Sequence, residues 1–424
     1  MTMTVAAPNA PKYAARMKRL EDAMSLRKPD RVPVAPVVVT YYANRIQGIP
    51  NRMVHYDLDL RNRVAREAAV RHSWDAAVSL TSVPLARPLE RLGLNQILWP
   101  GGGLPDDRPF QYVEGEFLLQ DEYDEMLSNP DVFAIKKLWP RISSKLGAAG
   151  AALAAPTLFY SNALFLPGFV GGALSAPGFR ELLHAMTDVA DEMAAAEAAS
   201  AQLSAEMQQL GYPVLYGAIG MTAFDFVSDF LRGLRGTLLD MYQVPDRLLA
   251  AVEMYTPWTI EQTLSWAKAY GHPGVFLPLH RGAGGFMSNE QFAKFYWPSL
   301  KALLLALIEA GYVPMPLFEG DFTPRLEFLQ ELPRGKVVGH FDKVDRRRAK
   351  ELIGDTMCFW GNVPSSLLCT ATAREVKDDV RELIEIFGDN GGLIIDGTVG
   401  IPDEAKPENV FALMEAANEY GRYS

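Results

Sequence analysis

Cysteine is almost absent from this chain, since its 424 residues include only Cys358 and Cys369. No CxxC pair occurs, so the spacing excludes a zinc knuckle and a dithiol redox site. Cys358 lies in the apolar run TMCFWGNV, which predicts a core position. Sparse cysteine favours a reducing compartment, and we therefore expect a cytoplasmic protein.

The chain also lacks an excess of positive charge and a long uninterrupted apolar run. Its net charge of −10 argues against nucleic acid or an anionic membrane as the main partner. The first residues, MTMTVAAPNAPKYAARMKR, lack the apolar segment of a signal peptide. The most apolar stretch, Leu158 to Leu174, contains polar residues, proline and glycine and is short for a membrane span. We expect it to be buried or to face substrate.

The second half of the chain alternates short apolar runs with amphipathic segments. The runs cover residues 213–220, 274–280, 313–320, 336–342, 356–363 and 391–398. Near-continuous hydrophobicity over this length is typical of strands that are buried on both faces of a parallel sheet. Strands that alternate with helices predict an α/β fold, a (β/α)8 barrel of the TIM type.

Two of the intervening helices carry signals at their ends. Ser288 and Gln291 form a capping box at the start of one helix, and Gly311 stops it. Pro298 predicts a kink or a split within this helix. Asp345 is the expected N-cap of the second helix.

The first half is less regular. Residues 30–40 and 76–80 have the pattern of early strands, whereas residues from about 94 to 208 have a helical and loop-like pattern. That region contains an alanine-rich helix at Val189–Met207. Since no clear linker separates it, we expect residues 1–424 to form one barrel domain with a cap-like helical region.

Polar side chains close the late apolar runs. In a barrel of this kind, the chemistry takes place where strands end, so these side chains should converge on one mouth. The set consists of His280, Glu319, Asp321, His340, Asp342, Asn362 and Asp396. Each member alone also has an ordinary explanation, because strand-end Asp and Asn residues often cap helices and a lone histidine is often a core residue.

Glu319 and His340 end two of these runs and have twenty residues between them. Glutamate and histidine suit zinc, which accepts oxygen and nitrogen ligands and keeps an open position in catalytic sites. A metal-free acid–base pair, in which His340 titrates near neutrality, explains the same residues. The spacing leaves both interpretations open.

Four segments resemble the uroporphyrinogen decarboxylase superfamily: RLEDAMSLRKPDRVPV, FMSNEQFAKFYWPSLKALLLALIEAG, DKVDRRRAKELIGDTMCFWGNVPSSLL and GIPDEAKPENV. The resemblance covers most of the chain and is strongest after about Gly211. It implies a (β/α)8 barrel and one of two activities. One is decarboxylation of a porphyrinogen, and the other is zinc-dependent transfer of methyl groups to or from a corrinoid carrier.

Departures from the family patterns narrow this choice. The decarboxylase has an arginine-rich RQAGR-type segment where this chain reads VVVTYYANR, which offers few partners to a substrate with many carboxylates. Methanol- and methylamine-type methyltransferases have His-x-Cys-Gly where this chain has Leu317 and Glu319, and a later cysteine at Val399. We therefore do not expect their thiolate site.

The ether-cleaving methyltransferases of O-demethylase systems are more similar, because they use a Glu and a His twenty residues apart as zinc ligands. This resemblance implies that Glu319 and His340 are ligands. The second Glu of that family corresponds to Leu304, so the third ligand would be Asp321, His280 or Glu309, and we take Asp321.

The predicted function is a zinc-dependent methyltransferase. It would take a methyl group from a small methylated substrate, an aryl ether, and pass it to a corrinoid (cobalamin) on a partner protein. The leaving oxygen would be protonated by His280, Asp342 or Tyr41. Substrate would contact Phe224, Phe226, Phe286, Trp360, Arg281, Asn362 and Asp396, although core packing also explains each aromatic residue.

Two other functions stay open. A decarboxylase or another lyase would bind a small carboxylate through Arg281, Arg232 or Arg235. A non-catalytic binding barrel would turn its strand-end residues outward. The expected partners are a small-molecule substrate and a corrinoid carrier protein, with a second copy of the chain as a further option.

Overall fold

The computed structural model describes residues 9–77, 83–148 and 163–423, and the chain divides into two compact units. Unit 1 consists of Met1–Val83, Ser200–Asp225 and Tyr255–Ser424, and unit 2 consists of Pro84–Ala199 and Phe226–Met254. The predicted cap region overlaps the first segment of unit 2, and its residues 149–162 lie outside the described residues. The expectation of a single domain remains a prediction.

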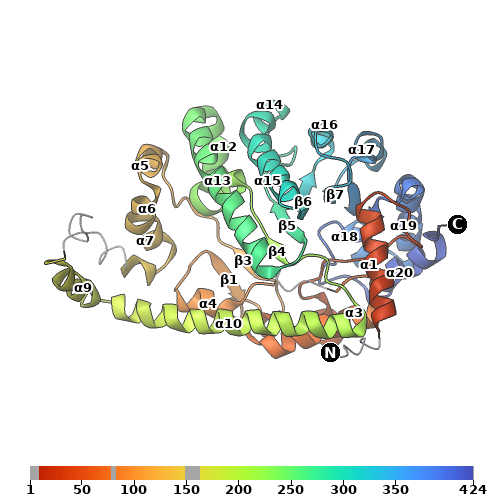
Figure 1. The fold of residues 1–424 in the computed structure, drawn as a ribbon, viewed down its shortest axis with the longest axis horizontal. Coiled ribbons are helices and arrows are strands. Elements are labelled where there is room, and N and C mark those ends of the chain that lie inside the picture. Colours follow the sequence, from red (N-terminus) through yellow and green to blue (C-terminus); the bar gives the residue numbers. More distant parts are fainter. Residues whose placement is uncertain (1–8, 78–82, 149–162, 424) are drawn as a thin grey trace, which may run out of the picture. The chain divides into compact units, whose positions relative to one another are not determined.

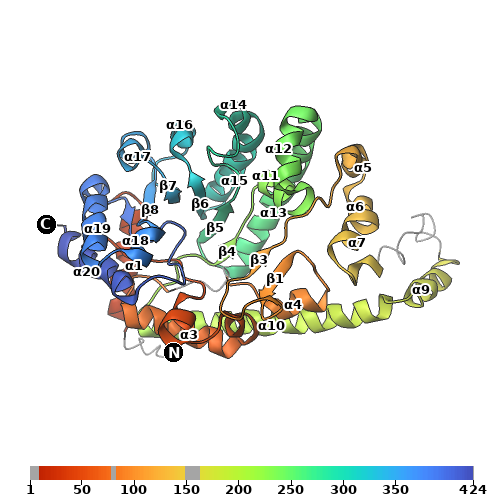
Figure 2. The ribbon, with the colours of Figure 1, turned by 180° about the vertical axis from the view of Figure 1, so that it is seen from behind.

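Unit 1 contains a parallel sheet whose strands follow chain order, β4-β5-β6-β7-β8-β9. The strands are β4 (Ala218–Ile219), β5 (Gly274–Leu279), β6 (Val313–Asp321), β7 (Val338–Lys343), β8 (Cys358–Gly361) and β9 (Leu393–Ile394). Each one lies within, or within one residue of, an apolar run predicted to be a strand. Figure 2 shows β4 to β8 in this order, and α15, α16 and α17 lie along their outer side there and in Figure 1.

A segment around Val34 continues the sheet beyond β9. Ala35 N donates to Ile395 O over 3.1 Å, and Ile395 N donates to Pro33 O over 2.9 Å. This segment is joined in turn to the next one, because Asp75 N donates to Val34 O over 2.8 Å. The predicted strand at 30–40 is therefore present as a short bridged segment.

The segment around Ala77 completes the ring. Ala77 N donates to Pro213 O over 2.6 Å, and Ala77 forms a parallel bridge with Val214, just before β4. Residues 78–80 of the strand predicted at 76–80 lie outside the described residues. With the six strands of the sheet, these two segments form a closed ring of eight, so the predicted (β/α)8 barrel is confirmed.

The helices of unit 1 follow the strands as the alternation predicts. They are α1 (Ala10–Met24), η1 (Tyr42–Ile46), α2 (Asn51–Tyr56), α3 (Leu58–His72), α14 (Asn289–Gln291), η7 (Phe292–Tyr296), α15 (Trp297–Glu309), η8 (Thr323–Arg325), α16 (Leu326–Leu329), α17 (Arg346–Ile353), α18 (Ser365–Thr370), α19 (Ala373–Phe387), η9 (Gly388–Asn390) and α20 (Pro407–Tyr420). Three helices run from one unit into the other: α10 (Phe179–Leu210), α11 (Ala223–Phe226) and α13 (Pro245–Tyr270).

The predicted helix signals are confirmed. Ser288 and Gln291 form the capping box of α14, and Asp345 accepts a hydrogen bond from Arg348 N at the start of α17. The helix with Pro298 is split, because the π-helical turn η7 precedes α15 and the proline lies in the first turn of α15. A proline is tolerated there because the first turn leaves its N–H groups unbonded in any case.

Unit 2 has a small sheet in the order β2-β1-β3, formed by β1 (Ile97–Pro100), β2 (Gly103–Leu104) and β3 (Gln111–Tyr112). Its helices are α4 (Ala86–Arg91), η3 (Gln120–Glu122), α5 (Tyr123–Ser128), α6 (Pro130–Phe133), η4 (Ala134–Leu138), α7 (Trp139–Ile142), α9 (Leu166–Leu174), η6 (Val227–Arg232) and α12 (Gly233–Gln243). The apolar stretch that includes α9 was expected to be buried or to face substrate, and its described part is not buried, while the second alternative stays a prediction. Leu164 is 87% exposed and Phe165 is 57% exposed, while residues 158–162 are outside the described part. Within the described ranges, no helix combines the length and the hydropathy that a membrane span requires.

Candidate functional site

The alternation of side chains along the strands indicates which strand-end residues face the inside of the barrel. Phe276, Leu317, Val338, Trp360 and Ile394 belong to the buried core cluster of the barrel. Side chains two or four positions further along a strand point to the same side. By this count, the inner face carries His340 and Asp342, which lie within β7. His280, Asn362 and Asp396 follow the last residues of β5, β8 and β9, and Glu319 lies within the register irregularity of β6, so the alternation does not place these four. Asp321 lies beyond a register shift in β6, so the alternation does not place it.

The register of the sheet separates His340 from Glu319. Leu317 of β6 pairs with His340 of β7, and His340 pairs with Trp360 of β8. Glu319 lies two residues closer to the mouth, which is about 6.6 Å at about 3.3 Å per residue. Glu319 and His340 were expected to share one metal ion, but they lie in successive layers of the barrel.

His340 is a core residue in this arrangement. Its side chain is fully buried, and its ring lies against Trp360 with the centroids 4.1 Å apart. Nε2 is 3.2 Å from Gly397 O and 3.3 Å from Asp396 Oδ2, whereas Nδ1 has no hydrogen-bond partner among the described residues. Burial lowers the pKa of His340 to about 3, so the ring is neutral and Nε2–H donates to the Gly397 carbonyl.

Asp396 is also fully buried and holds the backbone near the barrel seam. Its Oδ2 accepts a hydrogen bond from Val37 N over 2.9 Å, and its Oδ1 accepts one from Gly397 N over 2.6 Å. Burial raises the pKa of Asp396 well above its ordinary value, although the two backbone donors oppose this shift. The Asp396 side chain therefore stabilises the local backbone. Because it is fully buried, a substrate cannot contact it in this structure.

The two residues that do meet at the mouth are His280 and Glu319. His280 follows β5 directly, and Glu319 lies near the end of the neighbouring strand β6. The His280 Nε2 atom is 3.9 Å from Glu319 Oε1, and the side chains are 27% and 37% exposed. This pair combines an imidazole and a carboxylate at a position that a substrate can reach.

Asp225 fixes the backbone that carries His280. It is fully buried, and its carboxylate accepts hydrogen bonds from Tyr296 Oη (2.6 Å), Arg281 N (3.1 Å) and His280 N (3.4 Å). Thr222 Oγ1 donates to the same carboxylate over 3.0 Å. The sequence analysis missed Asp225. The only local signal is Thr222 three residues earlier, a helix-capping pattern that says nothing about its contact with Tyr296.

A cavity of about 710 Å³ lies at the ends of β7 and β8. Its walls include Asp342, Asn362, Ser365 and Thr398, together with three cationic and three further acidic side chains, Lys343, Arg346, Arg347, Asp345, Asp379 and Glu382. His280 and Glu319 are not in its lining. Asp342 connects this cavity to the His280–Glu319 pair. Its side chain lines the cavity, and its Oδ2 accepts a hydrogen bond over 2.9 Å from the backbone N of Gly320, the residue after Glu319.

Other predicted residues lie away from the His280–Glu319 pair. Asp321 accepts a hydrogen bond from Thr323 N over 3.0 Å and lies 3.5 Å from Lys343 Nζ. Partial burial opposes the shift, but Thr323 and Lys343 together lower the pKa of Asp321. Tyr41 is fully buried and packs 6.2 Å from His72, with no hydrogen-bond partner for its hydroxyl in the described ranges.

The four aromatic residues that were predicted to contact substrate do not lie together as one group. Phe224 is fully buried against Tyr296, at 5.2 Å between ring centroids, and Trp360 lies in the barrel core. Phe226 belongs to unit 2, whereas Phe286 lies 5.8 Å from the Arg281 guanidinium. Core packing accounts for the two fully buried rings, so Phe286 is the aromatic side chain that lies near the His280 strand end.

The arginines proposed for a lyase differ in availability. Arg232 is buried and donates to Asp240 Oδ2 (2.6 Å), Glu116 (2.8 Å) and Leu118 O (2.9 Å). These contacts join segments of unit 2. They occupy the Arg232 guanidinium, so it is not available to bind a substrate carboxylate. Arg281 belongs to unit 1 and follows His280 directly in the chain.

A zinc ion requires donor atoms at suitable spacing. The described residues contain no group of three or more His, Cys, Asp or Glu side chains that could hold a metal, so the predicted trio of Glu319, His340 and Asp321 is not assembled. Two ligands bonded to one tetrahedral zinc at about 2.1 Å each lie about 3.4 Å apart. The 3.9 Å between His280 Nε2 and Glu319 Oε1 is close to this separation. The pair offers two donor atoms, one fewer than the three protein ligands of a catalytic zinc site.

Comparisons with known proteins agree with this architecture. Two curated uroporphyrinogen decarboxylases are 26% identical, over 139 residues for that of Psychromonas ingrahamii and over 140 residues for that of Enterobacter sp. (strain 638). Each alignment covers 32% of this chain and 39% of the relative. A methyltransferase from Methanosarcina mazei superposes with a TM-score of 0.61 over 95% of this chain and 98% of its own. Its sequence identity is 16%, so this likeness concerns the fold alone. The model of the uroporphyrinogen decarboxylase (URO-D) family matches residues 208–420, half of the chain, and the chain belongs to this family.

Proposed function

We propose that this chain is a methyltransferase that acts on a small methylated substrate, an aryl ether, at the mouth of its barrel. The observation that carries the proposal is the pairing of His280 Nε2 with Glu319 Oε1 at 3.9 Å on neighbouring strand ends. Removal of a methyl group from an ether leaves negative charge on the oxygen. A group that neutralises this charge in the transition state lowers the barrier.

His280 can supply that neutralisation as a general acid. The neighbouring Glu319 carboxylate favours the protonated imidazole, because an opposite charge at this distance stabilises it. Nε2–H would then donate its proton to the leaving oxygen. Asp225 accepts a hydrogen bond from His280 N and is itself held by Tyr296 Oη, which fixes the backbone that carries the ring.

Zinc is the alternative to this acid, with His280 and Glu319 as its two protein ligands. A zinc-bound Nε2 carries no proton, so in this form the ion, and not His280, would neutralise the charge on the leaving oxygen. Such an ion would polarise the substrate heteroatom as a Lewis acid. The methyl acceptor in the proposal is a reduced corrinoid on a separate carrier protein.

The charges beside the pair argue against a porphyrinogen substrate. The lining of the cavity at β7 and β8 has four carboxylates and three cationic side chains, and each of the three cations already lies within 4 Å of an acidic side chain. A substrate with many carboxylates would meet repulsion there and would have to displace these ion pairs.

The test compares Glu319→Gln with Asp321→Asn, a matched loss of one carboxylate two residues away. Protein purified without chelator is analysed for zinc and then assayed for methyl transfer from methoxylated aromatic compounds to reduced cobalamin, followed by the cobalamin absorbance. We expect Glu319→Gln to lose zinc and turnover and Asp321→Asn to keep both. Full turnover of Glu319→Gln would refute the role of the pair.

Arg281 supports a second candidate, a lyase that acts on a small carboxylate. It lies next to His280 in the chain, and its guanidinium stays near Phe286 at the mouth. The same protein, incubated with small carboxylic acids, would then release carbon dioxide without zinc or cobalamin. Loss of that activity in Arg281→Gln, with no methyl transfer by the unmodified chain, would establish this alternative.

A further inference from the structure

A second cavity lies at the opposite end of the barrel, where the strands begin. Its volume is about 360 Å³, in the lower range of small-molecule sites. Helix α1, the starts of the first two barrel segments and helix α20 form its walls, with Lys12, Ala15, Arg16, Arg19, Arg31, Ser73, Asp75, Met414 and Asn418 in the lining. The lining of this cavity includes neither His280 nor Glu319, and it shares no residue with the cavity at β7 and β8. A ligand bound here would therefore not depend on the proposed function.

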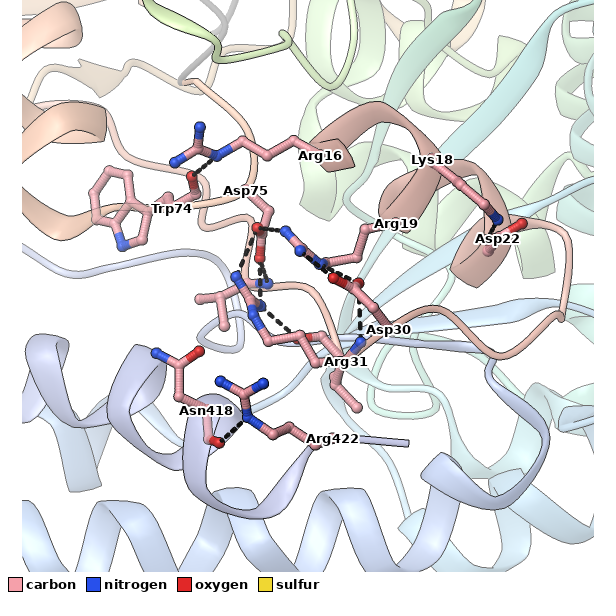
Figure 3. Close-up of polar contacts among 12 residues, drawn as sticks. Arg16, Lys18, Arg19, Asp22, Asp30, Arg31, Trp74, Asp75, Asn418 and Arg422 are labelled. Atoms are coloured by element: carbon pink, nitrogen blue, oxygen red, sulfur yellow. Dashed lines mark hydrogen bonds and ion pairs between the residues drawn. The ribbon is translucent and has the colours of Figure 1, made fainter. Parts of the chain in front are cut away.

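The lining contains four cationic side chains, Lys12, Arg16, Arg19 and Arg31. Two of them, Arg19 and Arg31, form ion pairs that help to close the barrel. Asp75 is fully buried and receives Arg19 Nη1 over 2.6 Å and Arg31 Nη1 over 2.7 Å (Figure 3). Arg19 also binds Asp30 through two nitrogens. These ion pairs fasten α1 and the first barrel segment to the second one, and they account for both arginines and both carboxylates.

Arg16 and Lys12 have no such explanation. Arg16 donates to two carbonyl oxygens, Trp74 O over 3.2 Å and Gly211 O over 2.9 Å, and its guanidinium lies 4.0 Å from the ring centroid of Tyr212. Neither Arg16 nor Lys12 forms an ion pair with a carboxylate in the part of the chain that the structure describes. They lie four residues apart on one face of α1, where like charges repel.

The charges around the cavity therefore do not balance. Lys12, Arg16, Arg19 and Arg31 are opposed by Asp75 and Asp30, which leaves two positive charges in a chain whose net charge is −10. The Arg16 guanidinium is already oriented by its two carbonyl contacts and by Tyr212. A fixed guanidinium beside an ammonium group is suited to a phosphate, which can accept several charge-assisted hydrogen bonds.

We propose that this cavity binds the phosphate group of a small phosphate monoester. The dianion of such a group matches the two uncompensated charges, and the volume leaves room for a few further atoms beside Ser73 and Asn418. Lys12 and Arg16 are the residues that bind the phosphate, and Asp75 keeps Arg19 and Arg31 in place around it.

Titration calorimetry on the full chain, in a phosphate-free chloride buffer of constant ionic strength, tests this proposal. The probes are inorganic phosphate and glycerol phosphate, with glycerol as the uncharged control. We expect saturable binding of both phosphates and none of glycerol. Binding should weaken as the pH falls from 7.5 to 5.5, since a phosphate monoester takes up a proton near pH 6.

Lys12→Gln and Lys18→Gln form a matched pair of variants. Both change one lysine of α1, but Lys18 lies outside the cavity lining and pairs with Asp22. We expect about tenfold weaker phosphate binding in Lys12→Gln, and in Arg16→Gln, from the loss of one charge-assisted contact, and unchanged binding in Lys18→Gln. Thermal unfolding of each variant without phosphate identifies any loss of folded protein.

The absence of saturable binding at millimolar phosphate would overturn the proposal, as would equal weakening in Lys12→Gln and Lys18→Gln. A third arm uses phosphatidylcholine vesicles with and without phosphatidic acid. Binding to phosphatidic acid vesicles without binding of glycerol phosphate would assign the cations to a lipid headgroup and would also overturn the proposal.

Discussion

The hydroxyl of Tyr296 donates a hydrogen bond to Oδ2 of Asp225 over 2.6 Å, and both side chains are fully buried. Tyr296→Phe should lower the free energy of unfolding by about 1.5–3 kcal/mol, because a buried carboxylate loses a donor. Urea unfolding measures this change. Tyr242→Phe is the control, since Tyr242 is 76% exposed and its variant should change stability by less than about 0.5 kcal/mol.

The same variant tests whether Asp225 positions His280. The ring-proton resonances of His280, assigned by comparison with His280→Gln, should move in Tyr296→Phe and stay in place in Tyr242→Phe. If Tyr296→Phe is destabilised but the His280 resonances do not move, Asp225 stabilises the fold without positioning His280.

His72 should make the fold sensitive to acid. It is buried between Trp74 and Phe411, at centroid distances of 4.7 and 4.4 Å, and neither ring nitrogen has a hydrogen-bond partner among the described residues. Burial lowers the pKa of His72 to about 4, whereas the unfolded chain takes up this proton near pH 6.5. The contribution of His72 to stability is therefore complete above pH 6.5 and is lost as the pH falls toward 4.

At pH 5, this loss amounts to about 2 kcal/mol. His72→Phe keeps an aromatic ring in the stack and cannot be protonated. We expect the free energy of unfolding of His72→Phe minus that of the unmodified chain to be about 2 kcal/mol higher at pH 5 than at pH 8, so the variant gains relative stability in acid. Urea unfolding at the two pH values measures the difference, and the exposed His184 supplies the control variant His184→Gln. An unchanged pH dependence in His72→Phe would contradict this account.

His280 and His340 should respond differently to the same substitution. His280→Gln removes the imidazole beside Glu319, so we expect loss of zinc and of turnover with little loss of stability. His340→Gln disturbs a fully buried ring against Trp360, so we expect a loss of about 1–3 kcal/mol in stability with zinc retained. Zinc analysis and urea unfolding of both proteins decide the matter, and zinc loss in His340→Gln alone would restore Glu319 and His340 as the ligand pair.

Arg232 should be essential for the stability of unit 2. Its ion pair with Asp240 is buried, with side-chain exposures of 4% and 0%. Arg232→Gln leaves the Asp240 carboxylate uncompensated, which costs about 3–5 kcal/mol. Hydrogen exchange of residues 226–254 should rise strongly, while Arg235→Gln, an exposed change in the adjoining helix α12, should leave it unaltered. Normal exchange in Arg232→Gln would show that the pair is dispensable and would return Arg232 to the candidates for substrate binding.

Much of the barrel could be predicted from the sequence, because its strands are buried on both faces and therefore form continuous apolar runs. Residues 274–279, for example, are predicted and observed as a strand. The first two barrel segments are less visible, since each is joined to its neighbours by only a few backbone hydrogen bonds. The alanine-rich stretch Val189–Met207 lies inside α10, where helix propensity and structure agree.

The candidate site was harder to predict, because it depends on register and on contacts between distant segments. An apolar run indicates where a strand ends but not which residue of the next strand lies beside it. Glu319 therefore meets His280 rather than His340, although both histidines follow apolar runs. Asp225 was missed because Tyr296 is far away in the sequence, and no local pattern records that contact.

The seam between Pro33–Ala35 and Ile395 also determines when the barrel can be completed during synthesis. Pro33–Ala35 leaves the ribosome long before Ile395, its partner in the sheet. Closing so long a loop is entropically costly, and such non-local pairing makes folding slow. Until Ile395 is available, the inner faces of the finished strands lack a sealed interior, which is a state prone to aggregation. The strands between these two segments are therefore exposed to aggregation until Ile395 has been synthesised.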